Sequence, residues 1–354
     1  MNKIYVAAAG AGKTEHIVRS ALGIYDPVLI TTYTDENVEE IKERFYKLNG
    51  RVPNNIVILP WYSFVLKYFI QPFQNIFYPD KIKGILLIPG TSAPFTKANT
   101  VEHFFSSNHE IYSDKIGKLA CKFISDFEQF PVQNLSAIFP HIFIDEMQDM
   151  ADYDIDLIKY LMCGLSNVTC VCDPRQSTFK TSNGRKNKAQ SGVNILNSFE
   201  DCDAEIDDTS LNINHRCHND ICVFSNSLYR SQYRETECGT NYEGEHLGLY
   251  LVRPQDVNEY LEQFHPMQLT DTIRQPYNAN FKRMNIGVSK GKSFDHTLLF
   301  IPGTHIKFIL TGKDTLQPKS KAILYVALTR ARYSAGIVCD YKDSFSHPLI
   351  KKFR

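Results

Sequence analysis

The sequence lacks several features that define common classes of protein. No stretch approaches the roughly 18 consecutive apolar residues that a membrane-spanning helix needs, although 43% of the 354 residues are hydrophobic. The nine cysteines include no CxxC pair, so the sequence predicts neither a disulfide framework nor a zinc ribbon. Low-complexity segments and fixed-period repeats are also missing. The composition therefore predicts a folded protein with no membrane partner.

An excess of one charge is missing too. Lys and Arg together number 39, as do Asp and Glu, so overall charge gives no sign of nucleic-acid binding and any basic surface must be local. The clearest acid-free basic stretch lies between 175 and 188, and a solvated loop explains it equally well. The short apolar run after Met1 leads into a glycine turn, so we expect no secretion signal and a cytoplasmic protein.

Short apolar runs alternate with helical patterns through the first half of the chain. The runs that predict strands are 4–9, 28–32, 56–59, 142–144 and 168–172. Strands that alternate with helices predict a parallel sheet. Asp145 and Asp173 follow two of these strands directly. Because ligands bind at the carboxyl edge of such sheets, we expect both acids to face the glycine loop after the first strand.

The alternation is broken once and then starts again. The segment from about 71 to 107 is rich in Pro, Phe and Asn, and we interpret it as a small insertion. After the acidic stretch 200–208, a second series begins. It comprises a helix at 219–229, strands at 247–252 and 297–301, and a last helix at 322–332 before a strand at 336–339. The prediction is an α/β protein of two domains, residues 1–205 with the insertion and residues 206–354.

A phosphate-binding loop is predicted near the N-terminus. Residues 7–14 read AAAGAGKT and stand between a predicted strand and a predicted helix, as the mechanism of such a loop requires. Gly10, Ala11 and Gly12 would let backbone N–H groups surround the phosphates. Lys13 would neutralise the β- and γ-phosphates, and the Thr14 hydroxyl would bind Mg²⁺. The first glycine of the general pattern is replaced by alanine.

Adjacent carboxylates follow the predicted strand at 142–144. The sequence there reads IDEMQD, from 144 to 149. Asp145 would hold Mg²⁺ through water, and Glu146 would orient and deprotonate the attacking water, which are the two tasks that an NTPase needs beside its phosphate loop. A helix N-terminus that favours acids explains the charge, but it does not explain the glutamine at 148.

With these two motifs the chain resembles the UvrD/Rep/PcrA-like helicases of superfamily 1, in which DExQD is the second motif. Further motifs follow in the family's order between residues 7 and 332. The segments similar to motifs Ia, Ib, III, IV, V and VI are 31–40, 61–64, 172–177, 211–216, 288–295 and 325–331. The resemblance implies two tandem RecA-like P-loop NTPase domains with parallel sheets.

The resemblance also implies roles for residues outside the first two motifs. Gln176 would sense the γ-phosphate, and Arg216 and Arg330 would reach across from the second domain as arginine fingers. Cations that arrive only when the domains close would couple hydrolysis to domain motion. His215 stands where the family has a tyrosine that stacks on the base, and histidine can also stack. Gly291 of motif V completes the predicted nucleotide-binding set.

Departures from the family's motifs affect the predicted binding of both the nucleotide and the nucleic acid. The glutamine-bearing segment that reads adenine in this family precedes the phosphate loop, but here the loop begins within ten residues of Met1, and Ser293 replaces the glutamate that contacts the ribose. Adenine selectivity is therefore in doubt. For single-stranded nucleic acid, which stacks its bases on aromatic rings, the candidates are Tyr33 and one of Trp61 or Phe179.

These observations predict an ATP-dependent DNA helicase or translocase of the UvrD-like type, which hydrolyses ATP with Mg²⁺ and moves on single-stranded DNA. By resemblance it would move 3′ to 5′, unwind little alone, and work with a protein partner such as a nuclease in phage defence or DNA repair. The alternative is a nucleotide-switched regulatory ATPase subunit that gates a partner without unwinding. A small-molecule kinase would leave motifs III to VI unexplained.

Overall fold

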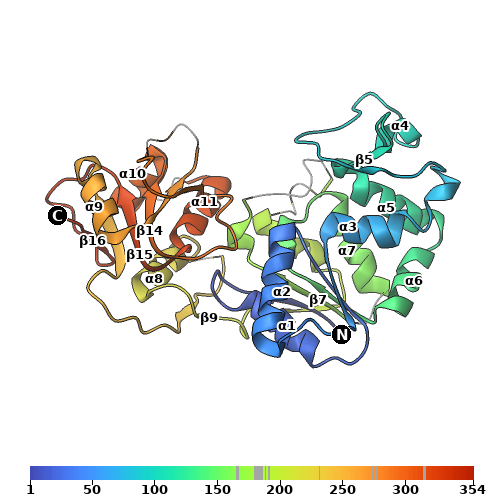
Figure 1. Cartoon of the computed structure of the whole chain (residues 1–354), viewed down its shortest axis with the longest axis horizontal. Coiled ribbons are helices and arrows are strands. Elements are labelled where there is room, and N and C mark those ends of the chain that lie inside the picture. The colour runs from blue at the N-terminus through green and yellow to red at the C-terminus, as the bar shows by residue number, and fades with distance from the viewer. Residues whose placement is uncertain are drawn as a thin grey trace. The chain divides into compact units, whose positions relative to one another are not determined.

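In the computed structural model the chain divides into two units, and most of its residues are described. The described residues are 1–164, 167–178, 186–187, 189, 192–230, 232–272, 275, 277–313 and 316–354. Unit 1 comprises Met1–Val6, Lys13–Pro174 and Phe179–Asp207, and unit 2 comprises Ala7–Gly12, Arg175–Thr178 and Asp208–Arg354. Two short loops, 7–12 and 175–178, therefore pack with unit 2, although their neighbours in sequence belong to unit 1. Figure 1 shows the course of the chain.

Unit 1 contains a six-stranded parallel sheet in the order β3-β2-β6-β7-β1-β8. Its strands are β1 (Asn2–Val6), β2 (Val28–Thr32), β3 (Ile56–Pro60), β6 (His141–Ile144), β7 (Val168–Cys172) and β8 (Ala204–Asp207). The sequence predicted β2 and β7 to the residue, but it extended β1 to residue 9, whereas β1 ends at Val6. Because β6, β7 and β1 are neighbours, the residues that follow them share one edge of the sheet.

Helices cover both faces of this sheet. They are α1 (Lys13–Leu22), α2 (Asp35–Asn49), α3 (Trp61–Val65), α5 (Ile116–Asp126), α6 (Phe130–Ile138) and α7 (Tyr153–Gly164). The apolar faces of α1 and α2, including Ile17 and Phe45, pack with β-strand residues in one core cluster, while α3, α5, α6 and α7 lie together on the other side (Figure 1). Thr34 caps α2 by accepting a hydrogen bond from the backbone N of Asn37.

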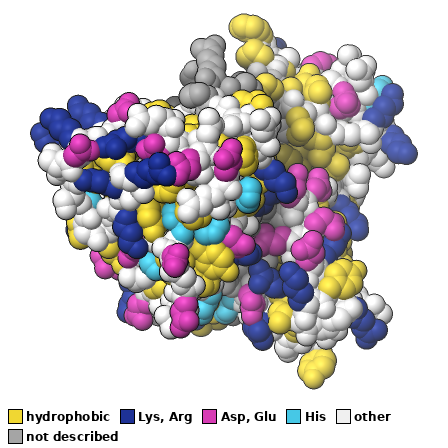
Figure 2. Space-filling model, turned by 60° about the vertical axis from the view of Figure 1, so that its left-hand side comes forward, with side chains coloured by type: hydrophobic (Ala, Val, Ile, Leu, Met, Phe, Trp, Pro, Cys, Tyr) yellow, Lys and Arg dark blue, Asp and Glu magenta, His cyan; other side chains and the backbone are white. Residues whose placement is uncertain are grey.

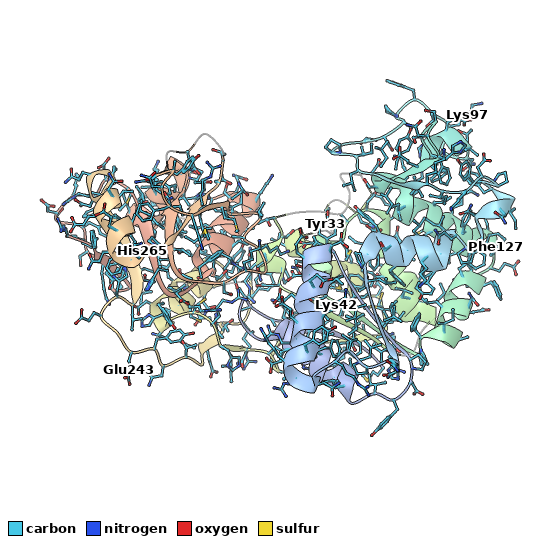
Figure 3. All side chains as sticks on the ribbon, viewed as in Figure 1. Tyr33, Lys42, Lys97, Phe127, Glu243 and His265 are labelled. Atoms are coloured by element: carbon cyan, nitrogen blue, oxygen red, sulfur yellow. The ribbon has the colours of Figure 1, made fainter. Side chains whose placement is uncertain are left out.

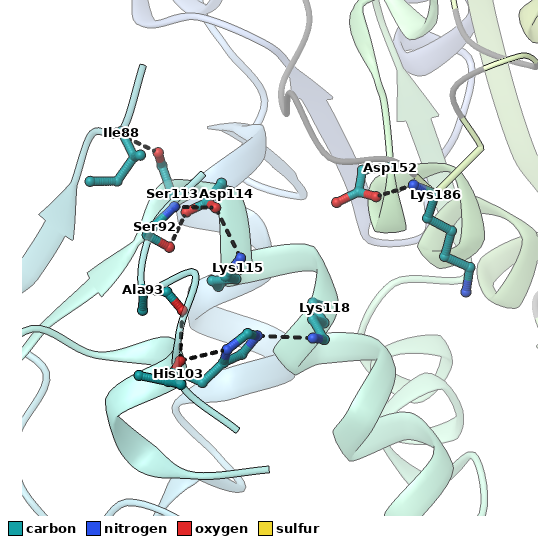
Figure 4. A network of polar contacts seen from close by, with 11 residues as sticks. Ile88, Ser92, Ala93, His103, Ser113, Asp114, Lys115, Lys118, Asp152 and Lys186 are labelled. Atoms are coloured by element: carbon teal, nitrogen blue, oxygen red, sulfur yellow. Dashed lines mark hydrogen bonds and ion pairs between the residues drawn. The ribbon is translucent and has the colours of Figure 1, made fainter. Parts of the chain in front are cut away.

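An excursion between α3 and α5 forms a small structure of its own. It contains β4 (Gly84–Leu86), α4 (Val101–Phe104) and β5 (Glu110–Tyr112), and β4 pairs in parallel with β5. Asp114 accepts hydrogen bonds from the backbone N and the Oγ of Ser92, at 3.0 and 2.6 Å. Lys118 of α5 donates to Nε2 of His103 at 2.9 Å. These contacts fasten the excursion to the start of α5 (Figure 4).

Unit 2 contains a second six-stranded parallel sheet, in the order β13-β12-β14-β15-β11-β16. Its strands are β11 (Gly248–Val252), β12 (Met267–Thr270), β13 (Arg283–Asn285), β14 (Phe294–Phe300), β15 (Ala331–Val338) and β16 (Ile350–Lys352). A separate short pair joins β9 (Ile213–Asn214) to β10 (Glu237–Cys238). The prediction of parallel sheets is confirmed in both units.

The helices of unit 2 also cover both faces of their sheet. They are α8 (Asn219–Ser227), α9 (Val257–Phe264), α10 (Gly303–Thr311) and α11 (Pro318–Leu328). Residues of α8, α10 and α11 share one core cluster, and α9 packs in another with Tyr250 and Leu298. The predicted helix at 322–332 is wrong at its end, because α11 stops at Leu328 and β15 already pairs with β14 through Ala331.

A stack of aromatic rings joins α9 to the sheet of unit 2. The ring of His246 lies 3.5 Å from that of Phe264 and 4.1 Å from that of Tyr250, between centroids, and its Nε2 is 2.8 Å from the Tyr260 hydroxyl. Burial lowers the pKa of His246 to about 4. The face turned forward in Figure 2 shows histidines beside hydrophobic side chains. Among the described residues, no helix is long and apolar enough to span a membrane.

Candidate nucleotide site

The glycine loop begins directly after the strand β1. Ala7, Ala8 and Ala9 are all buried, so the apolar run that predicted a longer strand forms the start of the loop instead. Gly10 and Gly12 have φ angles of 80° and 79°, a left-handed backbone that glycine adopts without steric cost. The helix α1 starts at Lys13. The loop therefore has the strand–turn–helix context that the phosphate-binding motif requires.

In unit 1 the predicted metal ligands lie side by side. The Thr14 hydroxyl donates a hydrogen bond to Oδ2 of Asp145 at 3.2 Å. Asp145 is almost fully buried, and burial together with the neighbouring Glu146 raises the pKa of its carboxyl well above the usual value, while Lys13 opposes the rise. A buried carboxylate beside a hydroxyl is a pair of hard oxygen ligands, the kind that Mg²⁺ prefers.

Glu146 is held by a chain of hydrogen bonds within unit 1. Its backbone is left-handed, with φ 55°, an unusual conformation for this residue type that functional sites often contain. Nε2 of Gln148 donates to the Glu146 carboxylate, and Oε1 of Gln148 accepts from the backbone N of Asp173 at 2.9 Å. Gln148 is fully buried. It thus ties Glu146, the second residue after β6, to Asp173, the residue directly after β7.

In unit 2 three hydrogen bonds hold the start of the glycine loop. Nδ2 of Asn214 donates to the carbonyl of Ala9 at 3.0 Å, and the backbone N of Ala9 donates to the hydroxyl of Tyr325 at 3.1 Å. The backbone N of His215 donates to the carbonyl of Gly10 at 2.9 Å. Sequence reasoning quoted Asn214 and Tyr325 within motifs IV and VI but gave them no role.

Arg330 and Gln176, two predicted γ-phosphate contacts, meet within unit 2. Arg330 lies between α11 and β15 with 1% of its surface exposed, and its Nη2 donates to Oε1 of Gln176 at 3.0 Å. The same guanidinium also donates to the carbonyls of Val326, Ser289 and Lys292 at 3.1, 3.4 and 3.2 Å. Arg330 is therefore a structural centre of unit 2 in addition to its predicted catalytic role.

The other predicted nucleotide residues of unit 2 are more accessible. Arg216 is half-buried, and its Nη1 donates to the carbonyl of Thr329 at 3.4 Å. His215 is exposed. Gly291 has φ 83° in the turn before β14, next to Lys292, whose carbonyl accepts from Arg330. Their predicted contacts to nucleotide stay predictions.

The three candidates for base stacking have different outcomes. Tyr33, labelled in Figure 3, follows β2 directly and is half-buried. Its ring is edge-on to that of Tyr62, with 6.3 Å between the centroids. Trp61 is fully buried, with its ring centroid 5.5 Å from that of Phe64. The choice of Trp61 as a base platform is therefore corrected, because no face of its ring is exposed. Phe179 lies outside the described residues.

The two units define a class of protein before any comparison with known ones. Two six-stranded parallel sheets covered by helices, a glycine loop after β1 and a buried acid after β6 make up tandem RecA-like domains of the P-loop kind.

Comparison with known protein families finds a helicase model that matches part of the chain. Residues 99–188 match the model of the UvrD/REP helicase N-terminal domain. The predicted resemblance to UvrD-like helicases is therefore confirmed. Among curated proteins, no sequence matches the chain.

Solved structures of viral helicases are similar in fold. Nonstructural protein 10 of an arterivirus, a helicase, is 13% identical with a TM-score of 0.50, covering 96% of this chain and 60% of that one. The PRRSV helicase is 14% identical, with a TM-score of 0.46 and coverage of 98% and 55%. The arterivirus helicase in complex with DNA is 12% identical, with a TM-score of 0.48 and coverage of 96% and 60%. The chain thus spans only 60% of the length of the first of these helicases.

Proposed function

We propose that this protein is a Mg²⁺-dependent ATPase that moves on single-stranded DNA, as a helicase or translocase of the UvrD-like type. The observation that carries the proposal is the arrangement in unit 1. There the Thr14 hydroxyl lies against the buried Asp145 carboxylate, and Glu146 is held by Gln148. A metal-binding pair and a fixed base are two of the parts that nucleotide hydrolysis requires, and the glycine loop after β1 supplies the third.

Thr14 and Asp145 are the residues that would hold Mg²⁺. The fit rests on their chemistry, because a hydroxyl and a carboxylate 3.2 Å apart can both bind a metal ion through oxygen. Mg²⁺ binds proteins through one or two carboxylates together with water and substrate phosphates. The bound ion would neutralise charge on the phosphates. Lys13, at the start of α1, would add a positive charge for the β- and γ-phosphates.

Glu146 is the proposed general base. The hydrogen bond from Gln148 fixes the direction of its carboxylate, and Gln148 is itself held by the backbone N of Asp173. A carboxylate fixed in this way can orient an attacking water and accept its proton without first losing side-chain freedom. This set also argues against the alternative of a regulatory subunit, since a pure switch has no need of a positioned base.

Gln176, Arg216 and Arg330 are the proposed γ-phosphate contacts of unit 2. Transition-state charge on the phosphoryl group is stabilised by cations placed where that charge develops. Arg330 holds the Gln176 side chain through its carbonyl oxygen, so the donor end of that side chain is its amide NH₂. His215 and Gly291 complete the proposed nucleotide set.

Tyr33 remains the proposed platform for a base of the DNA strand, with Phe179 as a second candidate from the sequence. Its half-exposed ring follows β2 at the carboxyl edge of the sheet. Movement in the 3′ to 5′ direction and a nuclease or other repair or defence partner are added by resemblance to the family, and the cytoplasmic location is the expectation of the sequence analysis.

Phosphate release from Mg-ATP, with and without single-stranded DNA, tests the proposal. Lys13→Ala and Glu146→Gln should each lower turnover at least 100-fold. Glu146→Gln should still bind a fluorescent ATP analogue, because glutamine keeps the shape but cannot accept the proton. The exposed acid Glu36 on α2 offers a matched control, and Glu36→Gln should behave as the wild type. ATP turnover that does not change when DNA is added would contradict the proposal that the protein moves on DNA. Unchanged turnover in Glu146→Gln would contradict the assignment of Glu146 as the general base.

A further inference from the structure

We propose that Asn214 and Tyr325 are positioning residues that clamp Ala9 and so preorganise the phosphate loop to receive a nucleotide. The proposal rests on the proposed nucleotide site and adds two residues to it. Both residues lie in unit 2 with the loop segment Ala7–Gly12. Between them they bind the backbone N–H and the carbonyl of one residue, Ala9.

The Asn214 amide is oriented by its own backbone partners. Its Oδ1 accepts hydrogen bonds from the backbone N of Arg216 at 2.8 Å and of Cys217 at 2.9 Å. With the oxygen engaged there, Nδ2 is directed to the carbonyl of Ala9 at 3.0 Å. The side chain is 3% exposed, so water does not compete for these bonds and the amide is fixed in one orientation.

The Tyr325 hydroxyl is fixed by the packing of its ring. The guanidinium of Arg175 lies 5.6 Å from the ring centroid, and the ring of Tyr229 meets it edge-on at 5.8 Å. Tyr325 is 2% exposed and Ala9 is 1% exposed. A buried N–H needs a partner, and the Tyr325 hydroxyl supplies it at 3.1 Å.

The clamp forms hydrogen bonds with the backbone of Ala9, at the start of the loop, and not with the N–H groups of the two glycines. It holds the N–H and carbonyl of Ala9, while His215 holds the carbonyl of Gly10. Within the described part of the chain, the N–H groups of Gly10 and Gly12 make no hydrogen bond. Phosphates are bound by backbone N–H donors. Carbonyls tied back and N–H groups left available are what a preformed anion site requires.

Gly10 shows how closely the clamp approaches the loop. A Cβ atom at this position would lie 2.7 Å from Cβ of Arg216 and 2.8 Å from Oδ1 of Asn214. Only glycine leaves room for the asparagine to reach the backbone next to it. Glycine is therefore required at position 10 for two reasons, the left-handed backbone and the close approach of Asn214.

Equilibrium binding of a fluorescent ADP with Mg²⁺ to the full chain tests the clamp. Tyr325→Phe removes one hydroxyl and leaves the Ala9 N–H buried without an acceptor, a loss of about 1–2 kcal/mol. The dissociation constant should rise about 5- to 30-fold, while kcat at saturating ATP falls less than threefold. Tyr229→Phe is the matched control, because it removes a hydroxyl that donates to the carbonyl of Arg175. It should bind ADP within twofold of the wild type.

A second variant separates the clamp from local structure. Asn214→Asp keeps an oxygen for the N–H groups of Arg216 and Cys217 but places a carboxylate oxygen against the Ala9 carbonyl. ADP binding should weaken at least tenfold, by more than any loss of folded protein at the assay temperature accounts for. ADP binding as tight as the wild type in both Tyr325→Phe and Asn214→Asp would overturn the clamp, and tighter binding would show that the contacts oppose the nucleotide. A wild type that binds no Mg-ADP would refute the proposed function itself.

Discussion

Removing the Arg330 side chain should destabilise unit 2, whereas removing that of Arg216 should not. The buried Arg330 guanidinium makes hydrogen bonds to the carbonyls of Val326, Ser289 and Lys292, to Oε1 of Gln176 and to Oγ1 of Thr329. Arg330→Ala removes a donor that these acceptors share in the interior and opens a cavity, at a combined loss of about 3–5 kcal/mol. For a unit of this size, the melting temperature should fall by roughly 6–20 °C.

Arg216 provides the matched comparison. It is half-buried, and its side chain donates one hydrogen bond, to the carbonyl of Thr329 at 3.4 Å. Arg216→Ala should therefore change the free energy of unfolding by less than about 1 kcal/mol, even if it abolishes turnover. Thermal and urea denaturation of both variants, measured beside ATP turnover, separates the two roles. The reasoning is refuted if Arg330→Ala melts at the wild-type temperature, or if Arg216→Ala is the less stable of the two.

Three further predictions concern other parts of the molecule. Trp61 is the only tryptophan and is fully buried. Its fluorescence should therefore not be quenched by iodide and should not change when single-stranded DNA is added. Quenching by DNA would restore Trp61 as a candidate for base stacking. Because burial lowers the pKa of His246 to about 4, against an unfolded value of about 6.5, its contribution to stability is complete above pH 6.5 and is lost as the pH falls toward 4. Since the ring is half-buried, we expect the free energy of unfolding, measured with urea, to fall by on the order of 1 kcal/mol between pH 7 and pH 4.5. His246→Phe should remove this dependence on pH. The same pH dependence in both proteins would contradict the prediction. Gln148→Glu places a second carboxylate beside Glu146 and should lower kcat at least tenfold with ADP binding retained, while a normal kcat would show that Gln148 does not orient Glu146.

The strands were predictable where apolar runs had clear ends. The run at 28–32 is bounded by Pro27 and Tyr33 and forms β2 as expected. Ala7 to Ala9 continue the apolar pattern of β1, but they form the start of the loop. Alanine is small enough for either place, and the partners that decide the outcome, Asn214 and Tyr325, lie 205 and 316 residues away from Ala9 in sequence. Local pattern carries no information about such distant hydrogen bonds.

Motif order located the chemistry of the site better than it located the surfaces. Adjacent acids after a strand predicted the position of Asp145 beside Thr14 because parallel strands end at a common edge. Whether an aromatic residue is exposed depends on packing between helices that are distant in sequence, and Trp61 is enclosed in the core of unit 1. Trp61 and Phe179 therefore stayed alternatives in the sequence analysis, because nothing in the local pattern decides which ring is exposed.

The helix α11 connects the phosphate loop to the proposed arginine finger. Tyr325, within α11, accepts the Ala9 N–H, and Arg330, two residues past the end of α11, holds Gln176. Arg330 is also tied to the helix by the bond from its Nε to the carbonyl of Val326, the residue after Tyr325. A buried helix moves as a rigid element, because its close-packed interior leaves few alternative positions. The bonds that hold Ala9 and Gln176 are therefore less than two turns of helix apart.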